Sequence, residues 1–437
     1  MTRYRELLFC LAFLPLAACH HGDDPRAEAA PAGTSRGLVE PARIDAALAG
    51  FVERGELVGV SALVYEDGEE AYFGAFGLAD RESGSPMRRD TLVRIYSMTK
   101  PITGVTLMSL YEEGLFDLDD PLAKYLPEFA SVRVFAGDEG GAPVLVEPSR
   151  PPTIRDILRH TAGFGNDDSD EWLARRYTEA DILAPDNSLQ ELSQRLAGVP
   201  LEYHPGTRWH YGPSVDVQAR LVEVLTAQPF ADVMRERVLD PLGMSETRYR
   251  LQPGQLGRFA AIYERDTDGT FKRIDAYNGD TVNISDWTLT PGGWGLASTL
   301  DDYMRFARML LGEGALGGVQ ILEPETVRLM ATDAMPATVT DRAWLPGKGQ
   351  VGFGIDFAVR IAPPADNAEN SGAVGEFFWD GAANTLFWVD PANDIVAVLF
   401  VQYVPFGPPP VQKAFRDAVY FRDDVASALN KPPRGAE

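Results

Sequence analysis

The order of strand-like and helix-like segments restricts the possible folds of this 437-residue chain more than any other feature. Near the N-terminus, two apolar stretches flank the turn sequence Glu66-Asp-Gly-Glu69, which predicts a β-hairpin. Near the other end, further strands are expected at 351–359, 377–378, 385–389 and 395–403. Helical spacing prevails between them, most clearly at 189–196, 215–225, 300–311 and 324–330. This order indicates an α/β lobe built from both chain ends, with a helical region inserted.

We expect one large domain over residues 41–432. Its α/β lobe should comprise about 41–96 and 297–432, and its mostly helical lobe about 97–296. Helices are predicted at 41–53 and 411–429, close to the ends of the domain. A cleft between two such lobes is a natural place for a functional site.

The first residues have the pattern of an export signal. Arg3 and Arg5 precede an apolar stretch over 7–16, which is too short to span a bilayer as a permanent helix. The stretch ends in Leu16-Ala-Ala-Cys19, which resembles the lipobox of bacterial lipoproteins because small residues directly precede the cysteine. The alternative is an ordinary signal peptide with a cysteine near its cleavage site.

The lipobox resemblance implies a signal peptide over 1–18 and a lipid anchor on Cys19. Residues 19–40 show no periodicity and are rich in Ala, Pro and charge, so they are expected to be a flexible tether. The chain would then be anchored in the bacterial cell envelope. His20 follows the cysteine where some bacteria use aspartate for inner-membrane retention, which favours the outer membrane, facing the periplasm.

The charge of the chain argues against nucleic-acid binding. Its 64 acidic residues outnumber its 40 basic ones, for a net charge of −24, whereas phosphate recognition needs basic patches. The sequence also lacks the Cys/His spacing of metal sites and any phosphate-binding loop. We therefore expect neither a metal nor another cofactor.

A possible nucleophile occurs in Ser97-Met-Thr-Lys100, at the expected start of a helix. Residues three apart lie on the same helical face, so the serine hydroxyl and the lysine ammonium can approach each other. A serine hydroxyl needs such a neighbour to become nucleophilic, and the helix N-terminus favours a developing oxyanion. Because the pattern is short, a capping serine beside a solvated lysine is the alternative.

Four spaced motifs give that pair its context: Val93-Arg-Ile-Tyr-Ser97-Met-Thr-Lys100, Thr153-Ile-Arg-Asp-Ile-Leu-Arg-His-Thr-Ala-Gly163, Pro241-Leu-Gly-Met-Ser-Glu-Thr247 and Gly295-Leu-Ala-Ser-Thr-Leu-Asp-Asp302. Together they resemble the serine β-lactamase-related superfamily, nearest to class C β-lactamases and family VIII carboxylesterases. The resemblance covers about residues 41–430. It implies an α/β fold in which helices flank an antiparallel sheet, and catalysis through an acyl-enzyme.

The resemblance also implies roles for single residues. Ser97 matches the acylated serine, and Lys100 matches the lysine that holds or shuttles its proton. Tyr211, in Trp209-His-Tyr-Gly-Pro-Ser214 before a helix, matches the tyrosine that serves as general base. An adjacent ammonium stabilises a phenolate. The alternative for Tyr211 is a buried tyrosine with a bonded hydroxyl, and the histidines, including His160 at a helix end, are interpreted as packing or capping residues.

The third catalytic element is expected in Trp379-Asp-Gly-Ala382, on a strand. By resemblance, Trp379, Asp380 and Gly381 would contact substrate, and the backbone N–H groups of Ser97 and Ala382 would form the oxyanion hole. Gly381 would allow close approach of the substrate. Asp380 would disfavour anionic substrates unless its side chain points away.

Two departures from the β-lactamase pattern bear on the substrate. Pro213 stands where the asparagine of Tyr-x-Asn would be, and Trp379 replaces the lysine of Lys-Thr-Gly. Both missing groups hold β-lactams in that family, so we expect a carboxylesterase acting on small or medium acyl esters. The alternatives are a D-amino-acid peptidase or weak β-lactamase, and a catalytically inactive cell-envelope binding protein.

Overall fold

The computed structural model describes residues 37–420 except 141, 167–168, 275, 277–278 and 343–344. The expected signal peptide, Cys19 and most of the tether therefore lie outside the described residues. In the described part of the chain, no helix combines the length and the apolar character needed to cross a membrane.

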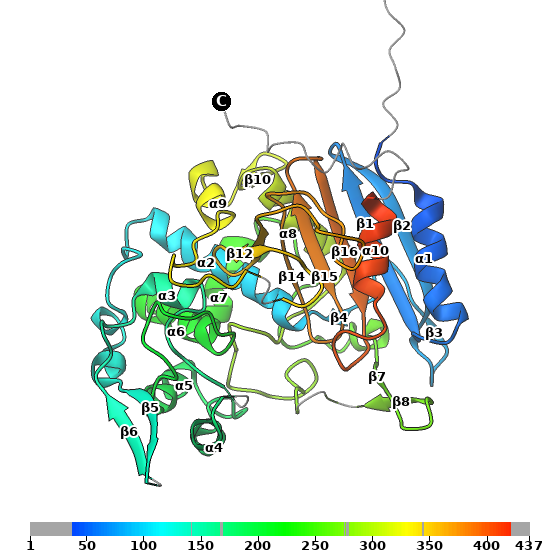
Figure 1. Cartoon of the computed structure of the whole chain (residues 1–437). Helices are drawn as coiled ribbons and strands as arrows, with labels where there is room; N and C mark the ends of the chain where they lie inside the picture. Colours follow the sequence, from blue (N-terminus) through cyan, green and yellow to red (C-terminus); the bar gives the residue numbers. More distant parts are fainter. Residues whose placement is uncertain are drawn as a thin grey trace, which may run out of the picture. The chain divides into compact units, whose positions relative to one another are not determined.

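Both ends of the chain contribute to one large sheet (Figure 1). Its strand order is β12-β13-β14-β15-β16-β1-β2-β3, and every neighbouring pair is antiparallel. The strands are β1 (Gly59–Glu66), β2 (Glu69–Asp80), β3 (Ser85–Pro86), β12 (Val351–Phe353), β13 (Ala358–Arg360), β14 (Phe377–Asp380), β15 (Leu386–Asp390) and β16 (Ile395–Val401). The N-terminal hairpin thus pairs with the C-terminal strand β16, with Val60 opposite Val401. The α/β class and the antiparallel sheet are confirmed.

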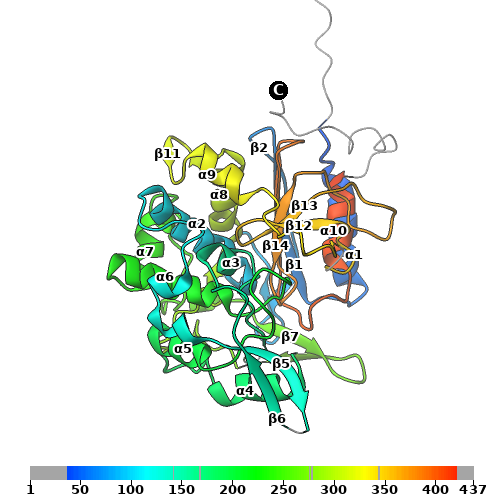
Figure 2. The same ribbon diagram turned by 60° about the vertical axis from the view of Figure 1, so that its left-hand side comes forward.

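Helices cover both faces of this sheet, as Figure 2 shows: α1 and α10 lie on one side, and α8 and α2 on the other. Every residue of β16 is buried, which agrees with its uninterrupted apolar sequence and its central place between two layers. The helices are α1 (Pro41–Glu53), α2 (Thr99–Glu112), α3 (Ile154–Leu158), α4 (Glu171–Ala180), α5 (Leu189–Ala197), α6 (Ser214–Thr226), α7 (Phe230–Met234), α8 (Leu300–Leu311), α9 (Pro324–Met330) and α10 (Val411–Tyr420).

Helices α2 to α7 lie together in the inserted region, where α2 packs against α6. The described residues also form small two-stranded sheets: β4 (Val93–Arg94) with β9 (Ala297–Ser298), β5 (Val134–Glu139) with β6 (Ala142–Val146), β7 (Ile262–Arg265) with β8 (Phe271–Ile274), and β10 (Ala315–Leu316) with β11 (Val319–Gln320), of which β10 packs against α8. The hairpins β5–β6 and β7–β8 were not predicted. The division of the chain into two lobes at 96 and 297 stays a prediction.

One predicted strand proves to be two. The expected strand at 351–359 is a tight hairpin, in which β12 turns back into β13. Asp356 adopts φ = 60° in the turn, a left-handed conformation that aspartate tolerates better than most residues. Because apolar residues fill the whole segment, the hydrophobic pattern conceals the turn.

Candidate active site

Ser97 is presented where the chain leaves a short strand and enters a helix. Strand β4 pairs with β9, a 3₁₀ turn over Tyr96–Met98 follows, and α2 begins at Thr99. Tyr96 adopts φ = 44°, so the backbone bends sharply just before the serine. Tyr303 of α8 donates a hydrogen bond to the Met98 carbonyl at 2.8 Å, which holds this turn against the sheet layer.

Lys100 lies on the first turn of α2 with its ammonium directed at Ser97. Its Nζ lies 3.3 Å from Ser97 Oγ and donates to the Gly293 carbonyl at 2.6 Å. The side chain is almost wholly buried, with 5% of the residue exposed. The alternative of a solvated lysine beside a capping serine is therefore wrong for Lys100.

Tyr211 reaches the same serine from the segment that precedes α6. Its Oη donates to Ser97 Oγ at 2.7 Å. Lys100 Nζ lies 4.6 Å from the centre of the Tyr211 ring. The ammonium therefore contacts both the Ser97 hydroxyl and the aromatic face of Tyr211. The structure thus brings Ser97, Lys100 and Tyr211 into one group of hydrogen-bonding contacts, although the tyrosine is distant in sequence.

Aromatic rings hold Tyr211 in place. The ring centroids of His160 and Trp379 lie 5.0 and 5.6 Å from that of Tyr211. Asn166 donates from Nδ2 to the Tyr211 carbonyl at 2.9 Å. Since the ring is packed and its backbone is bonded, the hydroxyl has little freedom to leave Ser97.

His160 was interpreted as a helix-end residue, but it is fully buried behind Tyr211. Burial lowers the pKa of His160 well below its ordinary value, with the charges of Lys100 and His210 adding to the effect. The imidazole is therefore neutral. Its backbone carbonyl accepts hydrogen bonds from His210 N at 3.0 Å and from Tyr203 Oη at 3.2 Å, which ties it to the segment that carries Tyr211.

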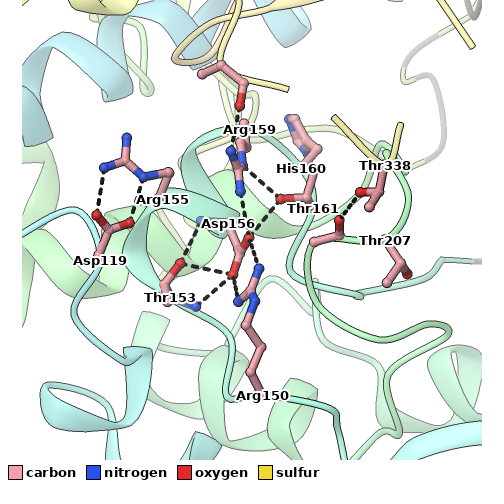
Figure 3. Close-up of polar contacts among 12 residues, drawn as sticks. Asp119, Arg150, Thr153, Arg155, Asp156, Arg159, His160, Thr161, Thr207 and Thr338 are labelled. Carbon is pink, nitrogen blue, oxygen red and sulfur yellow. Dashed lines mark hydrogen bonds and ion pairs between the residues drawn. The ribbon is translucent and has the colours of Figure 1, made fainter. Parts of the chain in front are cut away.

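A buried carboxylate fixes this part of the backbone (Figure 3). Asp156 has no exposed surface and accepts hydrogen bonds from Arg150, Arg159 and Thr161, the last at 2.9 Å. Thr153 and Asp156 also form a reciprocal cap at the start of α3. The motif at 153–163 thus supports the segment around Tyr211 and leaves the chemistry to other residues.

The segment after β14 lies against the backbone that leads to Ser97. Gly381 donates from its N–H to the Thr385 carbonyl at 2.9 Å. A Cβ at Gly381 would lie 2.5 Å from the Ile95 carbonyl oxygen, so a side chain there would push the two segments apart. Ala382, the second expected oxyanion donor, packs against a small apolar cluster that includes Tyr96. The segment therefore lies close to the backbone that precedes Ser97, and the oxyanion role of Ala382 stays a prediction.

Asp380 does not face the serine. Successive side chains of a strand point to opposite faces, and Trp379 is the one that contacts Tyr211. Asp380 Oδ2 instead lies 3.2 Å from Lys348 Nζ, which also donates to Gln412 of α10 at 2.7 Å. The Asp380 side chain thus points away from Ser97 and pairs with a buried lysine, which is the alternative that the sequence left open; a contact of residue 380 with substrate stays a prediction.

Two further groups near the site could not be recognised from the sequence. Gly293 offers the carbonyl that receives Lys100, and Asp216 of α6 accepts from the Gly293 N–H at 3.0 Å. The only hints are the Gly-Gly pair after Pro291 and the acidic residue just beyond Tyr211. Among the described residues, no cluster of His, Cys, Asp and Glu side chains could hold a metal ion.

A second buried carboxyl, Asp356, packs against α2 one helical turn beyond Lys100. A Cβ at Gly104 would lie 2.6 Å from Asp356 Oδ2, and Gln218 donates to Asp356 Oδ1 at 2.9 Å. Burial raises the pKa of Asp356 well above its ordinary value. Burial thus favours the protonated, neutral form of this group in the folded protein.

We expect Asp356→Asn to stabilise the protein more at about pH 7 than at about pH 5. The pKa of this carboxyl is higher in the folded than in the unfolded chain. Once the pH exceeds the pKa of the carboxyl in the unfolded chain, unfolding releases a proton, so the free energy of unfolding falls as the pH rises. Asparagine removes that cost, so the advantage of the variant should grow by up to about 1.4 kcal/mol per pH unit. Urea unfolding at both pH values measures it, with the exposed Asp186→Asn as control. An advantage that does not change with pH would contradict the assignment.

Known proteins resemble the chain over most of its length. Residues 44–420 match the family described as Beta-lactamase. Protein Rv1367c of Mycobacterium tuberculosis is 34% identical over 364 residues, which cover 81% of this chain and 88% of that protein. Esterase EstB of Burkholderia gladioli is 32% identical over 405 residues, which cover 87% of this chain and 95% of that esterase. The solved structure of EstCE1, described as a hydrolase with promiscuous acyltransferase activity, is 26% identical, with a TM-score of 0.71 over 87% of this chain and 98% of that one.

Proposed function

Because this chain belongs to the β-lactamase family and is a carboxylesterase-like serine hydrolase, we propose that Ser97 is its nucleophile and that Tyr211 and Lys100 activate it. The observation that carries the proposal is the contact of both groups with one oxygen atom. Tyr211 Oη lies 2.7 Å and Lys100 Nζ 3.3 Å from Ser97 Oγ. The Tyr211 distance lies within the range for proton transfer, and the Lys100 distance is slightly longer, as is common before substrate binds.

In the reactive form, the Tyr211 hydroxyl that donates to Ser97 Oγ in the structure has released its proton to solvent. Ser97 Oγ then attacks the ester carbonyl carbon while the Tyr211 phenolate takes the serine proton. The Lys100 ammonium stabilises the phenolate, since it lies over the ring and next to the reacting oxygen. The carbonyl oxygen becomes negative, and the backbone N–H groups of Ser97 and Ala382 bind it. Tyr211 then passes the proton to the leaving alcohol, which leaves the acyl group on Ser97.

Water completes the cycle by the same route. It loses a proton to Tyr211 as it attacks the acyl carbon, and the proton returns to Ser97 Oγ when the acid departs. His160 takes no part in these transfers, because it is neutral and its side chain packs behind the tyrosine ring. The chain's own residues thus provide nucleophile, base and oxyanion donors.

An uncharged ester fits the site better than a β-lactam carboxylate. Pro213 has no amide side chain to hold a substrate amide, and Trp379 has no charge to attract a carboxylate. Lys348 cannot replace the missing lysine, because its ammonium is engaged by Asp380 and Gln412 on the opposite face of β14. We therefore propose small or medium acyl esters as the substrate class.

An ester panel tests this assignment. The purified protein should hydrolyse p-nitrophenyl acetate, butyrate and octanoate with a kcat/KM at least about tenfold above that for nitrocefin or a D-alanyl-D-alanine amide. Intact-mass spectrometry of the protein mixed with a slow ester should show one added acyl group. Faster turnover of nitrocefin, or of the peptide, would replace the esterase assignment with β-lactamase or peptidase activity, and failure to acylate would favour a binding protein.

We also propose that the protein is a lipoprotein of the bacterial cell envelope, anchored through Cys19 on the periplasmic side of the outer membrane. The small residues directly before the cysteine support this, as does the short apolar stretch at 7–16. A lipid on Cys19 would place a tether of residues 20–40 between the membrane and the domain.

Cys19→Ser should release the protein from the membrane fraction and abolish its labelling by an alkyne fatty acid. The reason is that the thiol is the expected acceptor of the diacylglyceryl group. Cys10→Ser is the matched control, since residue 10 lies within the expected signal peptide and should not alter labelling. Label retained in Cys19→Ser would contradict the lipid anchor, and wild-type protein in the inner-membrane fraction would contradict the outer-membrane location.

A further inference from the structure

The segment Pro291-Gly-Gly-Trp-Gly295 contacts both α2, which carries Lys100, and α6, which follows Tyr211. Gly292 accepts a hydrogen bond at its carbonyl from Thr103 of α2 at 2.7 Å. A Cβ at Gly292 would overlap the Val215 carbonyl oxygen of α6. No side chain fits at this position, so the bare backbone of Gly292 approaches both α2 and α6 closely.

One residue of this segment joins two buried charged groups. The Gly293 carbonyl accepts from Lys100 Nζ at 2.6 Å, and the Gly293 N–H donates to Asp216 Oδ1 at 3.0 Å. A Cβ at Gly293 would lie 3.1 Å from Lys100 Nζ and 3.4 and 3.5 Å from the two Asp216 oxygens. The ammonium and the carboxylate therefore face the same small volume, which glycine leaves open.

Both charged groups are shielded from water. Asp216 is 4% exposed and Lys100 5%. A buried charge is costly unless an opposite charge or hydrogen bonds compensate it. Burial raises the pKa of Asp216, and the charge of Lys100 and the N–H groups of Gly293 and Gly292 offset part of this rise by stabilising the carboxylate.

Among the described acids near the lysine, Asp216 is the one joined to it through both polar groups of the Gly293 backbone. Burial raises the pKa of Asp356 well above its ordinary value and lowers the pKa of His160 well below its ordinary value, so burial favours the neutral form of each. Burial and the nearby Asp216 charge raise the pKa of the Tyr249 phenol well above its ordinary value, so that group is also uncharged. Apart from these, the groups facing Lys100 are the reacting hydroxyls of Ser97 and Tyr211.

We propose that Asp216 is a positioning residue, which acts through Gly293 to hold Lys100 as an ammonium ion beside Ser97 and Tyr211. The proposal rests on the proposed roles of those three residues. It gives α6 two functions, because Tyr211 precedes the helix and Asp216 lies in its first turn. The proposed base and the counter-charge of the lysine thus lie five residues apart, in the segment before α6 and in the first turn of that helix.

The test compares Asp216→Asn with the wild-type full-length protein on p-nitrophenyl butyrate. Asparagine keeps an oxygen for the Gly293 N–H but removes the charge. An ammonium without its buried counter-charge loses its proton more readily, so the alkaline limb of the kcat/KM profile should move down by about one pH unit or more. We expect kcat to fall by about tenfold or more while KM changes by less than about threefold, because Asp216 does not touch substrate.

Asp356→Asn is the matched control: it also replaces a buried acid near Lys100, but one that carries no charge. Its pH profile and kcat should match those of the wild type. A folded Asp216→Asn protein with the wild-type profile and kcat would overturn the proposal, since Asp216 would then serve only as a hydrogen-bond acceptor.

If Asp216→Asn does not fold, Gly293→Ala decides the question by the same measurement. The added methyl group would separate Lys100 from Asp216, so a lower kcat with a displaced alkaline limb supports the proposal, and an unchanged profile overturns it. Ser97→Ala is measured beside these variants. Activity that survives in Ser97→Ala would refute the proposed function itself, whereas an inactive Ser97→Ala with a normal Asp216→Asn refutes the positioning role alone.

Discussion

Replacing Ser97 by alanine is expected to lower kcat/KM for p-nitrophenyl butyrate by about 10³-fold or more. The substitution removes the oxygen that both Tyr211 and Lys100 contact, so no acyl-enzyme can form. The loss should come from kcat, because the substitution leaves in place the backbone N–H groups that we propose bind the carbonyl oxygen. Stopped assays over a range of substrate concentrations measure kcat and KM separately.

Two controls make the Ser97→Ala result specific. Ser83→Ala, at an exposed turn far from the group, should keep turnover within about twofold of the wild type. A fluorophosphonate should add to wild-type protein, with the adduct mapped to the peptide that contains Ser97, and should not add to Ser97→Ala. Normal turnover in Ser97→Ala, or an adduct on another residue, would refute the assignment.

Removing only the Tyr211 hydroxyl should have the second-largest effect. General-base catalysis contributes about 10²- to 10⁴-fold, so Tyr211→Phe is expected to lower kcat within that range. The phenyl ring keeps its packing against His160 and Trp379, and the site should therefore keep its shape. KM should change little, and the melting temperature should stay near that of the wild type.

Tyr125→Phe is the matched control, since it removes a hydroxyl that binds Asp120 at 2.6 Å and not the serine. It should leave kcat unchanged. Turnover of Tyr211→Phe at the wild-type rate would show that Lys100 alone takes the proton. A Tyr211→Phe protein that acylates in mass spectrometry but does not turn over would place the tyrosine in deacylation alone.

Much of the fold could be predicted because local signals agree with the tertiary structure. Helix α1 begins and ends at the expected residues, with Pro41 in its first turn. Helix α8 also matches, since Thr299 caps its N-terminus by accepting from Asp302 N. The expected hairpin around Asp67 and Gly68 forms because both residues adopt positive φ.

What escaped prediction depends on partners distant in sequence. The hairpin β7–β8 is held partly by contacts outside itself, such as a bridge from Tyr263 to Tyr403. The direction of the Asp380 side chain is set by Lys348, which belongs to another segment. For the same reason Asp216 could not be assigned, because only the folded chain places it across Gly293 from Lys100.

The pairing of β1 with β16 has a consequence for the order in which the protein can fold. The N-terminal hairpin is synthesised first, yet one edge of β1 lacks its neighbour until the chain has emerged as far as Val401. A topology with such non-local pairing folds slowly, because a long loop must close before the strands meet. An incomplete chain, whether ribosome-bound or truncated, therefore exposes the unpaired apolar edge of β1. The completed sheet closes that edge only when the last strands arrive, so the segments that carry Ser97 and Tyr211 are made before the sheet beside them is complete.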